Sequence, residues 1–306
     1  MTRLCKTRVL LNPRDEKRWG VTILKPIIKY RGGKQKEIPD FINRIPQDYH
    51  RYFEPFLGGG AVYFHMEPEQ AVVGDVNPKL ITFYQQLRDN YPLMQQQLDQ
   101  LQQQYEANQY EYEELKRQYP NERCENRNEA LYYHLREQYN HPTGEYLDGV
   151  LYYFINKTAY SGMIRYNSHG EYNVPFGRYR HFNTKVITKE HHDLLQRSSV
   201  LCSDYQALFE MATENDFMFL DPPYDCVFND YGNIDMMNGF DENEHRRLAA
   251  DFRNLNCPAL MIIGKTRLTE ELYAPYIRGE YQKRYAVNIR NRFQSNAIHI
   301  IVQNYD

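Results

Sequence analysis

The chain has 306 residues, enough for one large α/β domain with an insertion or for two modest domains. A hydrophobic fraction of 42% and a charged fraction of 25% exclude global disorder, and no apolar run approaches the ~18 residues that cross a bilayer. The formal net charge of −3 argues against a non-specific polyanion binder, but residues 1–36 hold eleven Lys and Arg against two acids, and residues 201–245 hold eleven acids and no Lys or Arg. The basic segment could contact phosphates while the rest of the surface is acidic. Charged surfaces that face only solvent would give the same uneven distribution of charge.

The cysteines are few and scattered, with no Cys-x-x-Cys pair: Cys5, Cys124, Cys202, Cys226 and Cys257. This spacing disfavours a disulfide framework and a structural zinc site, and it fits a reducing cytoplasm. The adjacent His191 and His192 lack a Cys or acidic partner at ligand spacing, so we expect no metal site. The basic N-terminus lacks the long apolar core of a secretory signal.

Six short apolar runs are predicted as buried strands: Tyr52–Phe56, Ala71–Gly74, Val200–Ser203, Phe217–Leu220, Leu260–Ile263 and Ile298–Val302. Helical or loop segments separate most of them, which predicts an α/β fold with a mostly parallel sheet covered on both faces. The gap between the second and third strands is too long for one crossover, so we expect a helical insertion over roughly 85–197. Within it, helices are predicted through Gln95–Gln104 and over Asn128–Tyr139.

The first strand enters a glycine-rich turn, and residues 51–61 read Arg-Tyr-Phe-Glu-Pro-Phe-Leu-Gly-Gly-Gly-Ala. Ligands of open α/β sheets bind where strands end and such turns begin, because glycine lets the backbone come close. The turn has neither the Gly-x-Gly-x-x-Gly spacing nor the Lys of a P-loop, which disfavours a dinucleotide or a triphosphate. Asp75 ends the next strand, 21 residues after Glu54, where an acid suits ribose hydroxyls. These features predict a nucleoside-type ligand, with a purely structural turn as the alternative.

The fourth strand stops at Asp221-Pro222-Pro223-Tyr224. Proline lacks the donor that a central strand needs, so the chain must leave the sheet here. This corner suits transfer to a weakly nucleophilic exocyclic amine, because Asp221 and the Pro222 carbonyl can accept the two amine hydrogens while the Tyr224 ring stacks on the base. A strand end whose Asp only caps a turn is the alternative. We expect this corner and the glycine turn to share one pocket.

The chain resembles the Dam-type (D12 class, alpha group) adenine-specific DNA methyltransferases, which use S-adenosylmethionine. The matching stretches follow the family's order and are Lys29-Tyr30-Arg31-Gly32-Gly33-Lys34, Phe53–Gly60, Asp75-Val76-Asn77, Asn156–Tyr179 and Asp221-Pro222-Pro223-Tyr224. Tyr30 stands where the family often has Trp, and Ser161 stands where it usually has Asn. Met163 and Ile164 also vary, and the resemblance becomes looser after residue 225.

This resemblance implies a Rossmann-like catalytic domain formed by residues 1–84 and 198–306, with a mostly helical target-recognition domain over 85–197. Asp221, Pro222 and Tyr224 would be catalytic. Tyr30 would pack near the methionine part of the cofactor, Lys34 would reach its carboxylate, and Asp204 would touch its adenine amine. The cofactor-binding residues that the resemblance assigns are Tyr30, Lys34, Glu54, Phe56, Gly58, Gly60, Asp75, Asp204 and Asp221.

The resemblance also implies double-stranded DNA as the substrate, with a G-A-T-C-like target whose adenine leaves the base stack. The residues assigned to DNA binding are Tyr160, Ser161, Arg165, Asn167, Pro175 and Arg178. Arg165 is expected to read a guanine edge, with a phosphate contact as the alternative, whereas Arg178, Arg180 and the basic N-terminus suit phosphates. A cognate restriction endonuclease acting on the same site is a further partner that the family admits.

Two other interpretations stay open at this point. The amine that is methylated could belong to cytosine, or to adenine in RNA, because the motif spacing excludes neither. Alternatively, the chain could be an inactive DNA-binding module on a methyltransferase fold. The intact Lys34, Asp75, Asp221 and Tyr224 argue against that second interpretation.

Overall fold

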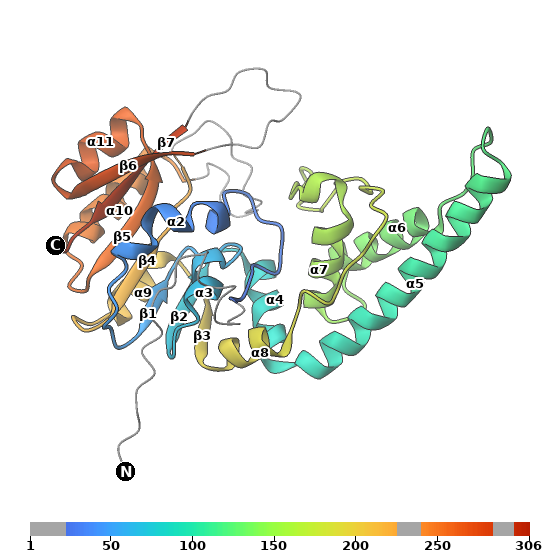
Figure 1. Ribbon diagram of the computed structural model, residues 1–306, viewed down its shortest axis with the longest axis horizontal. Coiled ribbons are helices and arrows are strands. Elements are labelled where there is room, and N and C mark those ends of the chain that lie inside the picture. Colours follow the sequence, from blue (N-terminus) through green and yellow to red (C-terminus); the bar gives the residue numbers. More distant parts are fainter. Residues whose placement is uncertain (1–22, 225–239, 284–296) are drawn as a thin grey trace, which may run out of the picture.

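The computed structural model describes residues 23–224, 240–283 and 297–306. Its centre is a seven-stranded sheet in the order β3-β2-β1-β4-β5-β7-β6 (Figure 1). The strands are β1 (Tyr52–Glu54), β2 (Ala71–Asp75), β3 (Ser198–Cys202), β4 (Phe217–Leu220), β5 (Ala259–Gly264), β6 (Ile277–Lys283) and β7 (Ala297–Gln303). The first five pair in parallel, and β7 lies antiparallel to both β5 and β6.

All six predicted strands are confirmed: Phe217–Leu220 has its predicted ends, and the other five differ by one or two residues at one or both ends. The first strand stops at Glu54, two residues before its predicted end, because Pro55 offers no backbone donor. The seventh strand, β6, was not predicted. Its residues alternate between half-buried and exposed, as an edge strand with one solvated face does, so it lacks the continuous apolar run that marks the inner strands.

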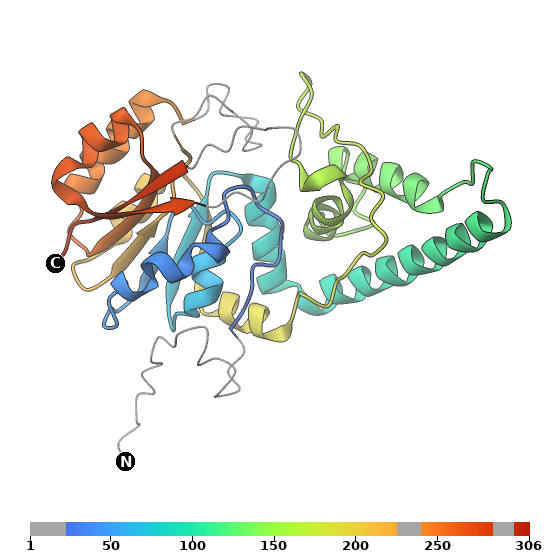
Figure 2. The same cartoon turned by 45° about the horizontal axis from the view of Figure 1, so that its top comes forward.

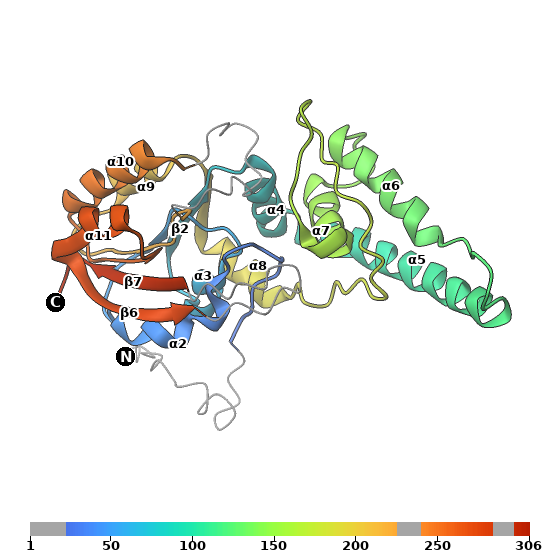
Figure 3. The ribbon, with the colours of Figure 1, turned by 90° about the horizontal axis from the view of Figure 1, so that it is seen from above.

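Helices cover both faces of the sheet, as the α/β prediction required (Figure 3). Side chains alternate along each strand, so Phe217 and Phe219 of β4 join one core while Met218 and Leu220 join the other. The first core contains residues of α2 (Ile38–Phe41), α3 (Ala61–Met66), α4 (Pro78–Asp89) and α8 (Lys189–Gln196). The second contains residues of α9 (Tyr205–Met211), α10 (Glu242–Arg253) and α11 (Arg267–Tyr273). Short 3₁₀ turns are η1 (Lys34–Lys36), η2 (Ile42–Arg44), η3 (Tyr160–Gly162) and η4 (Ala274–Tyr276).

The predicted helical insertion follows α4 and consists of α5 (Tyr91–Gln118), α6 (Arg127–Asn140), α7 (Asp148–Thr158) and the loops up to α8. Helix α5 runs away from the sheet, and α6 returns beside it (Figures 1 and 2). Leu98, Leu101 and Tyr105 are buried on one side of α5, as their spacing predicted. Helix α7 is buried on almost every side and forms the centre of this helical group.

A pair of hydrogen bonds joins the helical insertion to the segment before η1. The side chain of Asn156, near the end of α7, accepts from the backbone N–H of Lys29 at 2.8 Å and donates to the Lys29 carbonyl at 2.8 Å. Asn156 is only 5% exposed. Close by, a Cβ on Gly162 would lie 2.9 Å from Cδ of Lys29, so the chain after α7 packs directly on that lysine. The insertion is therefore fixed to the residue next to Tyr30.

Replacing Asn156 by Ala should lower the free energy of unfolding by about 1–3 kcal/mol, because it leaves a backbone donor and acceptor of Lys29 without their partner. Urea unfolding, followed by far-UV circular dichroism, measures the loss. Asn254→Ala is the matched control, since the Asn254 amide donates to the Ala250 carbonyl at 3.1 Å in an exposed position. A loss for Asn156→Ala no larger than for this control would refute the importance of the contact.

Three of the five cysteines fall within the described residues, and all three are free: Cys124, Cys202 and Cys257. Cys5, Cys226 and the basic segment 1–22 lie outside the described residues. Within the described ranges, no helix is long and apolar enough to cross a membrane.

Candidate active site

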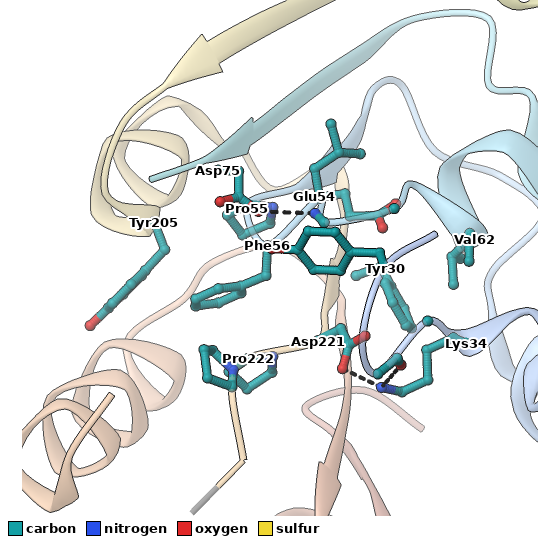
Figure 4. A pocket seen from close by; sticks show the side chains of 18 of the residues that line it. Tyr30, Lys34, Glu54, Pro55, Phe56, Val62, Asp75, Tyr205, Asp221 and Pro222 are labelled. Atoms are coloured by element: carbon teal, nitrogen blue, oxygen red, sulfur yellow. Dashed lines mark hydrogen bonds and ion pairs between the residues drawn. The ribbon is translucent and has the colours of Figure 1, made fainter. Parts of the chain in front are cut away.

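The glycine turn after β1, Asp75 at the end of β2 and Asp221 after β4 open into one cleft of about 880 Å³, its mouth included. The carboxyl ends of parallel strands meet at one edge of the sheet, which brings these three loops together. Asp75 lies on one side of the cleft, Asp221 and Lys34 lie on the other, and Phe56 lies between them (Figure 4). The two predicted corners therefore share one pocket, as expected.

The glycine turn requires glycine for steric reasons. Gly58 and Gly60 have φ of 48° and 64°, in the left-handed region that side chains disfavour. A Cβ on Gly58 would also lie 2.7 Å from Cε1 of Tyr30, and one on Gly59 would lie 2.9 Å from the Cβ of Tyr30. Tyr30 therefore packs directly on the turn and forms part of the cleft wall.

Asp75 is buried and is held by backbone donors. Its Oδ2 accepts from Gly58 N–H at 3.0 Å, and its Oδ1 accepts from Asn77 N–H at 2.9 Å. Burial raises the pKa of Asp75, and these hydrogen bonds oppose the rise. A carboxylate has about four acceptor sites, so Asp75 keeps capacity for a further hydrogen bond. The arrangement is chemically suited to ribose hydroxyls.

Lys34 and Asp221 form an ion pair at the other side of the cleft. The Lys34 side chain is 1% exposed, and its ammonium pairs with Oδ1 of Asp221, donates to the Tyr224 hydroxyl and lies 3.4 Å from the Gly32 carbonyl. Burial lowers the pKa of Lys34 and raises the pKa of Asp221, and the charge of each partner opposes the other's shift. Sequence reasoning placed Lys34 at the cofactor's carboxylate and did not foresee that it contacts the catalytic corner.

Aromatic rings line the remaining wall of the cleft. Phe56 lies 5.6 Å from the ring of Tyr205 and makes an edge contact with Phe240 at 6.0 Å. Such an aromatic wall suits stacking by a flat heteroaromatic ring. Tyr205, Phe240 and Arg31 line the cleft but were not assigned to it. Nothing in the local sequence distinguishes Tyr205 or Phe240 from ordinary helix or loop residues, whereas Arg31 lies within the matched stretch Lys29–Lys34.

Asp204 also lines the cleft, but other groups bind its carboxylate. Oδ1 caps α9 by accepting from Gln206 N–H at 3.0 Å, and Oδ2 pairs with Arg247 at 2.8 Å. Its predicted contact with the adenine amine of the cofactor therefore stays a prediction. The contacts observed are those of an N-cap that also neutralises a neighbouring cation.

The residues predicted to bind DNA lie together on the loops after α7, apart from the cleft. Tyr160, Ser161, Arg165, Pro175 and Arg178 are exposed. Asn167 instead organises a turn: its Oδ1 accepts from the backbone N–H of His169 and of Glu171, both at 2.9 Å. Ser161 and Arg178 have φ of 56° and 53°, an uncommon backbone conformation for residues other than glycine.

The described residues contain no group of three or more His, Cys, Asp or Glu that could hold a metal ion. His191 is buried, with its ring bonded to the Lys25 carbonyl at 3.0 Å and to the Thr188 cap. His192 lies against the Leu87 carbonyl at 3.2 Å.

The fold and the cleft define an α/β protein whose cleft suits a nucleoside-type ligand and carries an acidic Pro-Pro-Tyr corner. The sequence model of the D12 class N6 adenine-specific DNA methyltransferases matches residues 30–287, so the chain belongs to that family. Type II methyltransferase M.CviBI of Paramecium bursaria Chlorella virus NC1A is 33% identical over 290 residues, covering 92% of this chain and all of that protein. Type II methyltransferase M1.LlaDCHI of Lactococcus lactis subsp. cremoris is 27% identical, covering 92% of this chain and 96% of that protein. A DNA adenine methylase of Salmonella typhi is also 27% identical, covering 89% and 90% of the two chains.

The protein is accordingly a site-specific adenine DNA methyltransferase that uses S-adenosylmethionine. The family's adenine and DNA specificity decides against cytosine and RNA, and the relatives are named as methyltransferases and methylases, not as binding modules. The cleft fits the cofactor chemically, because it offers a carboxylate with spare acceptor capacity, a turn without side chains and an aromatic wall.

Glu54 generates a prediction about pH. It is 2% exposed, and the Tyr52 hydroxyl donates to its Oε2 at 2.6 Å. Burial raises the pKa of Glu54 to about 8, although the Tyr52 hydrogen bond opposes the rise. In the unfolded chain the pKa of Glu is about 4.3, so between these values the folded state binds more protons. This contribution to stability is therefore complete below about pH 4 and is lost as pH rises to about 8.

Glu54→Gln should remove that loss, because glutamine stays neutral and can still accept from Tyr52. Without cofactor, the unfolding temperature of the wild type should fall relative to Glu54→Gln as pH rises from 5 to 8, and the difference should level off above that. Differential scanning calorimetry at each pH measures it, with exposed Glu214→Gln as the control. A difference that is constant over this range would show that Glu54 is ionised throughout.

Proposed function

We propose that the cleft holds S-adenosylmethionine at the glycine turn and Asp75, and a swung-out adenine at the Asp221–Tyr224 corner. The observation that carries this proposal is that both corners line one cleft. When bound, the cofactor supplies an electrophilic methyl group on a sulfonium centre. Asp204 and Asp221 are paired with Arg247 and Lys34, so Asp75, whose oxygens accept from backbone N–H groups, is the acid of the cleft that favours such a cation.

The residues of the corner have distinct tasks in this proposal. Oδ2 of Asp221 and the Pro222 carbonyl accept the hydrogens of the adenine amine and orient its nitrogen, while Lys34 holds Oδ1. Such orientation can supply ~7–11 kcal/mol of the barrier reduction. Taking the base out of the duplex costs a few kcal/mol, and stacking on Tyr224 returns about 1–3 kcal/mol.

For the cofactor we assign Tyr30, Lys34, Glu54, Phe56, Gly58, Gly60, Asp75, Asp204 and Asp221, all of which, except Gly60, line the cleft. For DNA we assign Tyr160, Ser161, Arg165, Asn167, Pro175 and Arg178. Residues 1–84 and 198–306 then form the catalytic domain, and residues 85–197 form the target-recognition domain. The support for this division is that the insertion between β2 and β3 carries the exposed loops after α7.

The target sequence, a partner enzyme and the location belong to the same proposal. A G-A-T-C-like target rests on the family resemblance, and relatives named DNA adenine methylase support adenine as the methylated base. A cognate restriction endonuclease is supported by relatives named type II methyltransferase. A cytoplasmic location is supported by the DNA substrate.

Sequencing the modified adenines in DNA from cells that express the protein tests the target, and adenines methylated without a shared sequence would refute a specific site.

Asp221→Asn should abolish methyl transfer, with a loss of about 100-fold or more, because an amide has one acceptor oxygen and no charge, so it cannot both balance Lys34 and accept from the adenine amine. Methyl transfer into duplex DNA, followed by nucleoside mass spectrometry, measures it. Asp193→Asn is the control, since Asp193 pairs with Lys189 at 2.6 Å on the surface. An Asp221→Asn protein that is folded and keeps wild-type activity would refute the assigned role.

Arg165→Ala should relax the sequence preference at one base pair of the target. The exposed guanidinium of Arg165 is oriented by Asn173, which accepts from Nε at 2.7 Å, so a planar donor is presented to solvent. A bidentate contact with guanine contributes about 1–3 kcal/mol of discrimination. Methylation of a panel of single-substitution duplexes tests this, with Arg178→Ala expected to weaken all duplexes equally. Uniform weakening by Arg165→Ala would assign it to phosphate instead.

A further inference from the structure

A second group of charges lies directly behind the catalytic corner, and neither the sequence motifs nor the proposed cofactor and base contacts use it. Its centre is Glu37, which follows η1 and whose backbone N–H donates to the Lys34 carbonyl at 2.7 Å. The Glu37 side chain is only 7% exposed. A buried carboxylate needs compensating partners, so its contacts indicate what it does.

The partners of Glu37 come from the far end of the chain. Its Oε2 accepts from the Tyr281 hydroxyl at 2.7 Å and lies 2.7 Å from Nδ1 of His299. Its Oε1 pairs with the Lys283 ammonium at 3.0 Å. Tyr281 and Lys283 belong to β6, and His299 belongs to the paired strand β7. Glu37 therefore fastens the β6–β7 hairpin to the segment that carries Lys34.

The same partners support Tyr224. The side chain of His299 is 1% exposed, and its ring centre lies 5.0 Å from that of Tyr224. The ammonium of Lys283 lies 5.4 Å from the Tyr224 ring centre, and that of Lys34 lies 4.9 Å from it. Two of these three neighbours of Tyr224 bind Glu37 directly. A substitution at Glu37 would therefore alter the surroundings of the Tyr224 ring, although Glu37 itself is not one of these neighbours.

Taken together with the pair Lys34–Asp221, the charges around Glu37 balance. Lys34 and Lys283 are two buried or nearly buried cations, and Asp221 and Glu37 are two carboxylates. Burial alone would raise the pKa of Glu37, but the hydrogen bond with His299 and the charge of Lys34 bring it to about 2, so Glu37 stays ionised at neutral pH. Asp221 also faces both lysines, so without the negative charge of Glu37 their attraction for Asp221 would be less opposed and would draw its oxygens away from the amine.

We propose that Glu37 is a positioning residue for methyl transfer: it neutralises Lys283 and holds His299 behind Tyr224, so that Asp221 and Tyr224 remain available to the adenine. This inference rests on the roles proposed above for Asp221 and Tyr224. It adds a residue outside the cleft whose effect passes through the β6–β7 hairpin.

The test compares Glu37→Gln with Glu280→Gln, which removes a carboxylate from the same hairpin. Glu280 is 53% exposed and pairs with Lys265 at 2.6 Å on the surface. We expect Glu37→Gln to lower kcat by fivefold or more at saturating DNA and cofactor, with the calorimetric Kd of cofactor changed by less than threefold. Glu280→Gln should keep the wild-type kcat. A loss in kcat smaller than fivefold for a folded Glu37→Gln protein would overturn the proposal.

A second substitution separates charge balance from simple structural support. Adding Lys283→Met to Glu37→Gln removes the cation that Glu37 neutralises, and we expect it to recover at least part of the lost kcat. If Glu37 were merely structural, removing another of its contacts would lower kcat further, and that result would also overturn the proposal. Should Glu37→Gln not fold, His299→Gln replaces it, because glutamine can donate to Glu37 but has no ring to support Tyr224, and a kcat within twofold of wild type would refute the idea.

The outcome also distinguishes this inference from the proposed function. If Asp221→Asn is inactive while Glu37→Gln keeps its kcat, the positioning role fails and the catalytic assignment stands. If Asp221→Asn is active, the catalytic assignment itself fails.

Discussion

An ion pair between the buried Lys34 and the half-buried Asp221 joins two parts of the chain that are 187 residues apart. Removing either partner would unbalance the charges beneath the cleft, which disfavours the folded arrangement. Their separation in sequence means that the pair forms only when the sheet is complete. The cleft, the glycine turn and the acidic Pro-Pro-Tyr corner are therefore consequences of one folded arrangement.

The strand order places this pair where a ligand is expected. The chain winds outward from β1 to β2 and β3 on one side and from β4 to β5 on the other, so the loops after β1 and β4 separate at the carboxyl edge and leave a crevice. Asp75 ends β2 and Asp221 follows β4, the two parallel strands on either side of β1, whereas the exposed loops after α7 belong to the insertion. The contact between Asn156 and Lys29 connects those loops to the residue beside Tyr30, so DNA recognition and cofactor binding share a segment of backbone.

The sequence predicted the inner part of this arrangement well and its surroundings poorly. Phe217–Leu220 was predicted with its correct ends, because an apolar run that stops at two prolines has few other structures available. The glycine turn and Asp75 were found for a similar reason, because a turn that needs glycine and a strand that ends in an acid can both be recognised from a few consecutive residues. Strand β6 was missed because its alternating polar residues resemble a loop, and α5 extends well past the predicted Gln95–Gln104 because polar helix ends carry little periodicity. Glu37, Lys283 and His299 gave no signal, since only the three-dimensional pairing of distant segments brings them together.

The most direct measurement of the central claim is a crystal structure of the protein with S-adenosylhomocysteine and a duplex that contains the methylated sequence. The account predicts ribose hydroxyls at Asp75 and an adenine outside the base stack, with its amine nitrogen about 3 Å from Asp221 and its ring on Tyr224. An analogue bound away from the glycine turn, or a target adenine that reaches the cleft without contacting Asp221, would contradict it.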